Sequence, residues 1–356
     1  MVLPQWQSTE SIYETELRLN LKQDSKHHLK LDETIQLPYK KNYEKPQAIH
    51  KKERYKCFLG EFETKIYWGN LIGILVLHLL TLHTIVTFNY IKHFWLLCYV
   101  LLVGEIGGFG ITAGAHRYWT HKCFKATLPL KVILLFCYSI AGQNTILEWV
   151  KDHRVHHKFS ETDADPHNSN RGFLFAHVGW LCMKKHPEVI RKGKMIDVSD
   201  ICADPLVAFH VRHWTWFKAL CCFILPTIIP PVLFAQPWLL TIHLNIARYC
   251  LSLNFTWAVN SFAHFYGNKP YNKHIQPTEN KLVSWVSFGE GWHNYHHSFP
   301  WDYRAAEMGS RPNFTTFWLD LFARLGWAYD LKTTSSEIIG NMIKNKGDGS
   351  HIISQH

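Results

Sequence analysis

Four apolar stretches, each long enough to cross a lipid bilayer, constrain the fold of this chain more than any other feature. They cover residues 66–88, 94–115, 217–234 and 238–260, and each approaches the roughly 20 residues that a spanning helix needs. The links 89–93 and 235–237 are too short to hold a domain, so each pair should form a tight hairpin. The sequence therefore predicts an all-α membrane protein with four transmembrane helices in two hairpins.

Two hairpins leave the rest of the chain on one side of the membrane. Five basic residues flank the first helix on that side, whereas the opposite loop carries only Lys92; the five are Lys51, Lys52, Arg54, Lys56 and Lys65. The positive-inside rule makes this side cytosolic, with both termini on it. We expect a cytosolic N-terminal segment (1–65), an integral membrane domain (66–328) and a short cytosolic tail (329–356). Three prolines, Pro226, Pro230 and Pro231, should kink the third helix.

The charge and the cysteines narrow the class of protein further. The formal net charge is +10, but no compact Lys/Arg block with interleaved aromatics occurs. We therefore exclude nucleic acid as a partner and assign the charge to the membrane surface or to an anionic substrate. The nine cysteines contain no C-x-x-C pair, and several lie inside apolar runs, so we expect them to be reduced and packed.

Eight of the 24 histidines fall into three clusters on the predicted cytosolic side. They are His116 and His121, then His153, His156 and His157, then His293, His296 and His297. The second and third clusters share an i, i+3, i+4 spacing, which puts three imidazoles on one face of a helix. The i, i+5 spacing of the first cluster splays its two rings on a regular helix. Asn260 and His264, one turn apart at the end of the fourth helix, add a further polar pair.

These clusters predict a site for two metal ions. A lone histidine such as His177 or His210 is usually a satisfied core residue, but eight or nine at these spacings exceed the three or four that a zinc site uses. Imidazole suits zinc, copper, iron and nickel alike, so the spacing does not choose the metal. A membrane protein that binds or transports zinc is one alternative. Its ligands should lie at mid-membrane, however, whereas these lie at helix ends.

The residues around the clusters carry a resemblance to a known family. The stretches are Gly110-Ile-Thr-Ala-Gly-Ala-His-Arg117, Glu148-Trp-Val-Lys-Asp-His153, His157-Lys-Phe-Ser-Glu-Thr-Asp-Ala-Asp-Pro-His-Asn168, Asn260-Ser-Phe-Ala-His264 and Gly289-Glu-Gly-Trp-His-Asn-Tyr-His-His297. Between about residues 68 and 327 the chain resembles the membrane acyl-CoA desaturases of the stearoyl-CoA type, as an insect-like member. Membrane hydroxylases also contain the histidine clusters, but the residues that flank the clusters here resemble a narrower set of proteins and favour a desaturase.

The resemblance implies a fold, a cofactor and a reaction. The fold is a set of four spanning helices beneath a cytosolic helical cap, in the endoplasmic reticulum. Nine histidines bind two iron ions, and Asn260 acts through a water molecule. The reaction is the O2-dependent removal of two hydrogens from a long-chain saturated or monounsaturated acyl-CoA, at the Δ9 or Δ11 position, with electrons from NADH through a reductase and cytochrome b5. A hydroxylase or conjugase on the same scaffold remains an alternative.

By the same resemblance, an apolar tunnel bends the acyl chain beside the irons. Gln143, Trp149 and Thr256 match the residues that shape the bend, although Trp149 could equally be an interfacial anchor. The remaining expected substrate contacts, mostly with the CoA head, are Asn70, Asn144, Lys151, Asp152, Lys184, Lys185 and Trp257. Gly104 and Gly108 stand where bulky residues limit the tunnel in relatives. They predict a deeper tunnel, unless a neighbouring aromatic fills the space or the glycines only allow close helix packing.

A carboxylate in the second apolar stretch has no assigned role. Glu105 would be costly inside a bilayer unless it is paired or protonated. Arg248 in the fourth stretch is a candidate partner, but the sequence does not place the two residues together.

Overall fold

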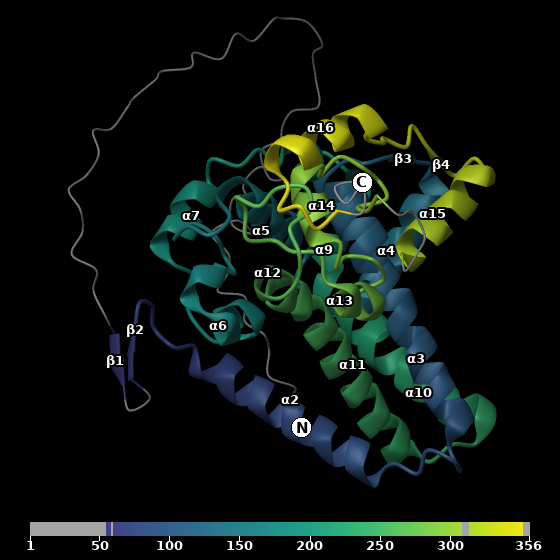
Figure 1. The fold of residues 1–356 in the computed structure, drawn as a ribbon. Helices are drawn as coiled ribbons and strands as arrows, with labels where there is room; N and C mark the ends of the chain where they lie inside the picture. Colours follow the sequence, from purple (N-terminus) through teal and green to yellow (C-terminus); the bar gives the residue numbers. More distant parts are fainter. Residues whose placement is uncertain (1–54, 58–59, 308–312, 352–356) are drawn as a thin grey trace, which may run out of the picture.

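A computed structural model describes residues 55–57, 60–307 and 313–351 of the chain. Most of the expected N-terminal segment, including Lys51, Lys52 and Arg54, lies outside the described residues. The described part is mostly helical. Long helices gather in the lower half of the view in Figure 1, and short helices and loops gather above one end of them. This arrangement leaves the long helices free to face lipid and the short ones free to build a site.

Helices occupy all four apolar stretches. In the described part of the chain, three are long and apolar enough to cross a membrane: Trp68–Thr87, Phe94–Thr120 and Pro205–Phe234. A fourth candidate is the pair α4 (Leu128–Ala141) and α5 (Ile146–Phe159), if the two helices, bent by 86°, count as one span. Helix α11 (Trp238–Asn260) has the expected bounds, but it is not among these candidates, because polar residues such as Asn245, Arg248 and Asn254 interrupt it.

The second long helix runs further than its apolar stretch. Helix α3 (Phe94–Phe109) continues without a break into the π-helix η1 (Gly110–Thr120), where each turn is wider than in an α-helix. A Cβ atom at Gly110 would collide with the backbone of Cys137 and Tyr138 in α4. The glycine therefore lets the start of η1 pack directly on the backbone of α4.

The third long helix contains the prolines. It joins α9 (Pro205–Phe217), the π-helical η4 (Lys218–Ile224) and α10 (Leu225–Phe234), so it starts well before the apolar stretch 217–234. Proline cannot donate to the carbonyl four residues earlier. The carbonyl of Cys222, four before Pro226, accepts instead from Asn245 Nδ2 at 3.1 Å and Arg248 Nη2 at 2.8 Å. Side chains of α11 thus satisfy the freed backbone.

The carbonyl of Pro226 shows the same compensation. It lies four residues before Pro230, and it accepts a hydrogen bond from the Tyr99 hydroxyl at 3.2 Å. Tyr99 belongs to α3, so α3 and α11 both support the proline-containing helix.

The first candidate span is helix α2 (Trp68–Thr87). The remaining elements are short. They are the helices α6 (Phe173–His177), α7 (Pro187–Gly193), α8 (Ser199–Cys202), α12 (Phe262–Phe265), α13 (Lys281–Val286), α14 (His293–Ser298), α15 (Phe314–Arg324) and α16 (Ser336–Lys346), and the 3-10 turns η2 (Ser169–Arg171) and η3 (Gly179–Leu181). Two antiparallel strand pairs join β1 (Tyr55–Cys57) to β2 (Gly60–Phe62) and β3 (Lys125–Ala126) to β4 (Ala328–Tyr329). The second pair ties the segment after α15 to the segment after η1.

Helix α16 packs over α14, at the top of the view in Figure 1. Ile339 and Ile343 form a buried cluster with Tyr271, Tyr295 and Phe299, and the Lys273 amide donates to the carbonyl of Lys346 at 2.8 Å. The tail of the chain is therefore a structural support for the third histidine cluster.

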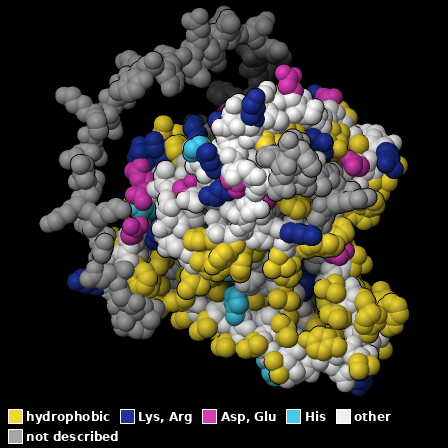
Figure 2. Space-filling model, in the orientation of Figure 1, with side chains coloured by type: hydrophobic (Ala, Val, Ile, Leu, Met, Phe, Trp, Pro, Cys, Tyr) yellow, Lys and Arg dark blue, Asp and Glu magenta, His cyan; other side chains and the backbone are white. Residues whose placement is uncertain are grey.

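The surface divides into an apolar half and a charged half. Hydrophobic side chains cover the lower part of the face shown in Figure 2, and charged side chains concentrate above it. Large apolar residues of the long helices are exposed, for example Val86, Trp95 and Leu233, as expected for helices that face lipid. Glu105 is exposed on α3, while Arg248, its candidate partner, donates to Asn245 and Cys222.

Candidate metal centre and substrate cavity

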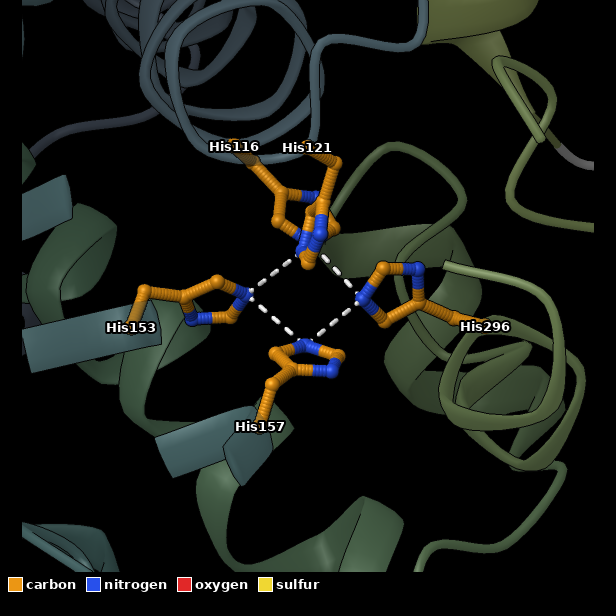
Figure 3. Close-up of side chains that lie close together, drawn as sticks. All are labelled: His116, His121, His153, His157 and His296. Carbon is orange, nitrogen blue, oxygen red and sulfur yellow. Dashed lines mark hydrogen bonds between the residues drawn. The ribbon is translucent and has the colours of Figure 1, made fainter. Parts of the chain in front are cut away.

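Five histidines converge in a first group (Figure 3). They are His116, His121, His153, His157 and His296, and their ligand nitrogens all lie within 4.8 Å of one another. Four contacts between Nε2 atoms define the group: His116–His296 at 3.0 Å, His121–His153 at 3.2 Å, His153–His157 at 3.1 Å and His157–His296 at 3.0 Å. The nitrogens thus surround one point.

Four further histidines form a second group. They are His156, His264, His293 and His297, again with ligand nitrogens within 4.8 Å of one another. The Nε2 atom of His293 lies 3.1 Å from that of His264 and 3.1 Å from that of His297. Asn260, the last residue of α11, lies one turn before His264 in the sequence. The two groups together contain the nine histidines that the sequence singled out.

Each helical cluster contributes to both groups. On α5, His153 and His157 enter the first group and His156 the second; on α14, His296 enters the first, and His293 and His297 the second. The i, i+3, i+4 spacing therefore lets one helix face two points at once. The two groups touch, because the rings of His157 and His297 stack with centroids 4.2 Å apart.

The π-helix explains the i, i+5 spacing of the first cluster. In η1 the amide of His121 donates to the carbonyl of His116 at 3.1 Å, an i to i+5 bond. Residues five apart are therefore stacked one turn above each other, and the two ring centroids are 4.9 Å apart. The rings do not splay, as they would on a regular α-helix.

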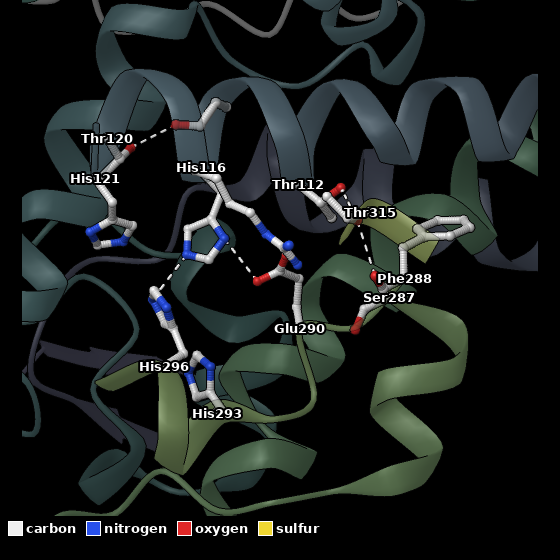
Figure 4. A network of polar contacts seen from close by, with 12 residues as sticks. Thr112, His116, Thr120, His121, Ser287, Phe288, Glu290, His293, His296 and Thr315 are labelled. Atoms are coloured by element: carbon white, nitrogen blue, oxygen red, sulfur yellow. Dashed lines mark hydrogen bonds and ion pairs between the residues drawn. The ribbon is translucent and has the colours of Figure 1, made fainter. Parts of the chain in front are cut away.

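Carboxylates hold the outer nitrogens of several rings. His116 Nδ1 lies 2.8 Å from Glu290 Oε2, a contact visible in Figure 4, and His156 Nδ1 lies 2.9 Å from Asp165 Oδ1. His264 Nδ1 lies 3.6 Å from Glu161 Oε1. A carboxylate at Nδ1 orients an imidazole and leaves Nε2 as the ligand atom, which is the usual arrangement around a bound metal.

Arg117 fixes Glu290 in turn. Its Nε and Nη2 atoms donate to Glu290 Oε1 at 3.1 and 2.8 Å, and Nη1 donates to the carbonyl of Tyr303 at 2.8 Å. Both side chains are buried. Burial alone would raise the pKa of Glu290, but Arg117 and His116 lower it to about 2, so this carboxyl is ionised. The sequence motifs contained Arg117, Asp165 and Glu290 without assigning them a role. Arg117 and Glu290 are 173 residues apart, and Asp165 lies beyond the end of the helix that carries its partner His156.

The chemistry of the donor set fits metal ions. Burial, together with neighbouring histidines, lowers the pKa values of His121, His293, His296 and His297 well below the usual range, so these rings are neutral. Neutral imidazoles are competent ligands. The buried Nε2 atom of His156 has no hydrogen-bond partner among the described residues. Lone pairs directed at one another without a cation repel, so a metal ion at each group would satisfy them.

A cavity runs alongside the first group. Its lining includes His153 and Trp149, whose rings stack with centroids 5.0 Å apart. The complete lining is Gly142, Gln143, Asn144, Trp149, Asp152, His153, His167, Trp180, Leu181, Lys218, Tyr249, Leu253, Thr256, Trp257 and Asn260. His153 therefore belongs both to the wall of the cavity and to the first histidine group.

The three residues expected at the bend are hydrogen-bonded together in the cavity wall. Trp149 Nε1 donates to Gln143 Oε1 at 2.9 Å, and Gln143 Nε2 donates to Thr256 Oγ1 at 3.0 Å. Trp214, which the sequence did not single out, fixes the backbone of Gln143 by donating from Nε1 to its carbonyl at 3.2 Å. The wall beside His153 is thus rigid.

The other expected substrate contacts divide between the cavity and its surroundings. Asn144, Asp152 and Trp257 line the cavity. Asp152 accepts hydrogen bonds from Lys185 Nζ at 2.6 Å, and Asn70 Nδ2 donates to the carbonyl of Leu181, a lining residue, at 2.9 Å. Four of the expected contacts do not line the cavity: Asn70, Lys151, Lys184 and Lys185.

The two glycines expected at the far end of a tunnel also lie outside this lining. A Cβ atom at Gly108 would collide with the ring of Phe288, so an aromatic already fills that space. A Cβ atom at Gly104 would contact Ser252 and Arg248 at ordinary distances of 3.6 and 3.7 Å. Both glycines serve close packing, of α3 on α11 and of α3 on the loop before α14, and their effect on tunnel depth stays a prediction.

Comparison with known proteins places these features in a family. The family described as fatty acid desaturase matches residues 93–307, which is more than half of the chain. The chain is 47% identical over 309 residues to an acyl-CoA Delta-9 desaturase of Acheta domesticus, covering 86% of this chain and 84% of that protein. It is 46% identical over 310 residues to an acyl-CoA Delta(11) desaturase of Spodoptera littoralis, covering 86% and 88%. It is 49% identical over 288 residues to a stearoyl-CoA desaturase of Bos taurus, covering 80% and 79%.

Proposed function

This chain belongs to the fatty acid desaturase family, and from that premise we propose that it is an acyl-CoA desaturase. It inserts a double bond, at the Δ9 or Δ11 position, into a saturated or monounsaturated long-chain acyl-CoA with the use of O2. The observation that carries this proposal is the position of His153, which belongs to the first histidine group and also lines the cavity. An acyl chain in that cavity lies against the metal centre.

Two iron ions would be held by the two histidine groups. His116, His121, His153, His157 and His296 would bind one ion, and His156, His264, His293 and His297 the other, with Asn260 acting through a water molecule. When bound, the iron pair supplies an oxidant strong enough to remove hydrogen from an unactivated methylene group, with electrons from NADH delivered through cytochrome b5 and its reductase. Asp165 and Glu290 keep the Nε2 atoms of His156 and His116 unprotonated and directed at the metals.

The residues of the cavity supply regioselectivity. A polymethylene chain has no polar group that could mark one carbon, so the walls must fix which methylene pair lies beside His153. The hydrogen-bonded wall of Trp149, Gln143 and Thr256 provides a fixed surface at this point. The CoA head would lie at the end of the cavity near Asp152, with Asn70, Asn144, Lys151, Lys184, Lys185 and Trp257 as further contacts.

The proposed setting is the membrane of the endoplasmic reticulum. The four helices α2, α3, α9–α10 and α11 would cross it as two hairpins within an integral membrane domain of residues 66–328. The short helices would form a cap on the cytosolic side, together with the N-terminal segment (1–65) and the tail (329–356). Support comes from the apolar surface of the long helices and from the position of both histidine groups near their common end.

Expression in yeast that lacks its own desaturase tests the proposal. Wild-type protein should restore unsaturated fatty acids, and mass spectrometry should locate the double bond at Δ9 or Δ11. His157→Ala and His296→Ala should abolish the product and lower the iron content of protein that still inserts in the membrane. His213→Ala, outside both groups, is the matched control. Hydroxylated or conjugated products would replace the desaturase reaction with one of the alternatives, and zinc in place of iron would refute the di-iron centre.

A further inference from the structure

One histidine of the cavity wall belongs to neither of the two histidine groups. His167 lines the cavity, is only 8% exposed, and meets the Trp180 ring edge to face, with centroids 4.7 Å apart. On another side its ring contacts that of His156, with centroids 5.1 Å apart. His167 is thus held firmly in the wall, although the proposed metal centre does not use it.

The ring nitrogens of His167 make no hydrogen bonds within the described part of the chain. Nδ1 is buried and lies 3.6 Å from Asp165 Oδ1, an oxygen that already accepts from His156 Nδ1 at 2.9 Å and from the His167 amide at 3.0 Å. Nε2 also lacks a partner there, but it is not enclosed as Nδ1 is. Since the ring lines the cavity, Nε2 is the nitrogen that is open to a ligand.

Asp165 determines which nitrogen of His167 carries the proton. A lone pair on Nδ1 would face the carboxylate oxygen and be repelled by it, so the proton belongs on Nδ1. Burial and the neighbouring metal site both disfavour a positively charged ring. Nε2 therefore presents a lone pair to the cavity, and its complement is a ligand group that donates a hydrogen bond.

His167 lies toward the polar end of the cavity. His156, which its ring contacts, follows Asp152 by about one turn of α5. The chain that contains Trp180 continues to Lys185, whose amine donates to Asp152 at 2.6 Å. His167 is therefore near the end where the CoA head of a substrate would lie, and away from the part of the wall that would hold the far end of the acyl chain.

An acyl-CoA molecule has one suitable donor close to its acyl chain. The chain itself carries no polar hydrogen, and the thioester offers only acceptors. The pantetheine amide next to the thioester carries an N–H group, separated from the sulfur atom by two methylene groups. A buried acceptor without a partner costs free energy, and this N–H group would remove that cost at His167.

We propose that His167 Nε2 accepts a hydrogen bond from the pantetheine amide nearest the thioester and thereby fixes where the acyl chain begins. Every carbon of the chain is a set number of bonds from this amide, so holding the amide helps to decide which methylene pair lies beside His153. His167 is a positioning residue for the carrier, and not a ligand of the metals. The inference rests on the proposed function, because it assumes that acyl-CoA occupies this cavity.

The test changes one atom of the ligand and one side chain of the protein. The ligands are palmitoyl-CoA and its oxa analogue, in which an ester oxygen replaces the amide N–H nearest the thioester. Calorimetric titration of the full-length protein in detergent measures both affinities without turnover. Wild type should bind palmitoyl-CoA about tenfold more tightly than the analogue. His167→Phe, which keeps a ring but no acceptor, should bind the two ligands equally.

Two further variants separate this contact from a general effect on the fold. His167→Gln, whose amide oxygen accepts hydrogen bonds, should retain most of the preference for palmitoyl-CoA. His274→Phe, at an exposed histidine, should keep all of it. In a desaturation assay, mass spectrometry should find the double bond of the His167→Phe product at neighbouring positions as well as at the main one.

Every outcome supports or overturns the proposal. Equal affinities of wild type for the two ligands would overturn it without any variant, and so would an unchanged preference in His167→Phe. A lower iron content in His167→Phe than in wild type would make His167 a metal ligand and would also overturn it. A single unchanged double-bond position in His167→Phe would refute its role in placing the chain. If wild type prefers palmitoyl-CoA to the analogue but does not desaturate it, the proposed function fails while the contact of His167 stands.

Discussion

Glu290 Oε2 lies 2.8 Å from His116 Nδ1, and the other oxygen of this carboxylate, Oε1, accepts a hydrogen bond from Arg117, which is 173 residues away in the sequence. A residue just before the third histidine cluster thus orients His116 of the first cluster. Buried Arg117 in turn connects Glu290 to Asn313 and Thr316 at the start of α15. Figure 4 shows Glu290 beside His116, with His121 and His296 of the same histidine group nearby.

Glu290→Gln should weaken metal binding more than it weakens the fold. The glutamine amide keeps the shape of the side chain but removes the negative charge beside His116 and Arg117. The tautomer and the basicity of His116 are then no longer fixed. Loss of such an outer partner typically costs 10–100-fold in metal affinity, and we expect a loss in about that range. Metal analysis of protein dialysed against graded chelator measures it. Glu188→Gln, on exposed α7, is the control, and equal iron retention in both variants would contradict this role of Glu290.

Gly110→Ala should destabilise the protein strongly. The added methyl group would collide with the backbone of Cys137 and Tyr138, which cannot move as a side-chain end can. Overpacking of this kind costs about 1–3 kcal/mol or more. Thermal unfolding of detergent-purified protein should show a lower midpoint. Gly340→Ala in α16, where a Cβ atom meets nothing within 4 Å, should unfold at or slightly above the wild-type temperature. Comparable midpoints for Gly110→Ala and wild type would show that η1 does not pack on α4 as described.

Gln143→Leu should broaden the set of products. Leucine removes the acceptor for Trp149 Nε1 and the donor to Thr256, so the cavity wall beside His153 loses its fixed shape. The double bond should then appear at neighbouring positions as well as at the main one, which mass spectrometry of the product pool measures. Gln236→Leu, in the short link between α10 and α11, serves as the control. A single unchanged position in Gln143→Leu would mean that this hydrogen-bonded wall does not set the register.

Glu279 should make stability fall with rising pH. Burial raises the pKa of this carboxyl to about 8, and its Oε1 accepts from the Tyr295 amide at 2.8 Å. Between the unfolded pKa near 4.5 and the folded value near 8, the folded state binds more protons than the unfolded state does. Stability therefore declines across that window, by at most about 1.4 kcal/mol per pH unit, and levels off above it.

The variant Glu279→Gln isolates this titration. It keeps an acceptor for the Tyr295 amide and does not ionise, so its melting temperature should change less than that of wild type between pH 6 and pH 9. The buried histidines also titrate between the folded and unfolded states, with the pKa of His156 raised and those of His293 and His297 lowered, but they contribute equally in both proteins. The difference between the two pH profiles therefore reports Glu279 alone. Parallel pH profiles of the two proteins would show that Glu279 is already ionised at pH 6.

The sequence predicted the features that depend on local spacing. Apolar length located the long helices, and the i, i+3, i+4 pattern placed His153, His156 and His157 on one face of a helix, from which they reach two neighbouring groups. The i, i+5 pair of His116 and His121 was harder to interpret, because a π-helix is a shift of backbone hydrogen bonds that side-chain periodicity does not reveal.

Features that join distant segments were not predictable. The carbonyls that Pro226 and Pro230 leave without a backbone donor accept from side chains of α11 and α3, and no local pattern pairs Asn245 or Tyr99 with these carbonyls. Likewise, the sequence contained Phe288 but not its contact with Gly108, which changes the space available beside α3. Glu105 faces outward, and Arg248 has other partners, so the proposed pairing of these two residues finds no support in the structure.

The packing of α16 against α14 has a consequence for biosynthesis. The ribosome makes the chain from its N-terminus, so the residues of α5 and η1 are complete long before Ile339 and Ile343 emerge. Until then Tyr295 lacks the apolar surface on which it rests, and the third cluster has no fixed position. The third cluster can therefore reach its final packing only after the residues of α16 have been synthesised.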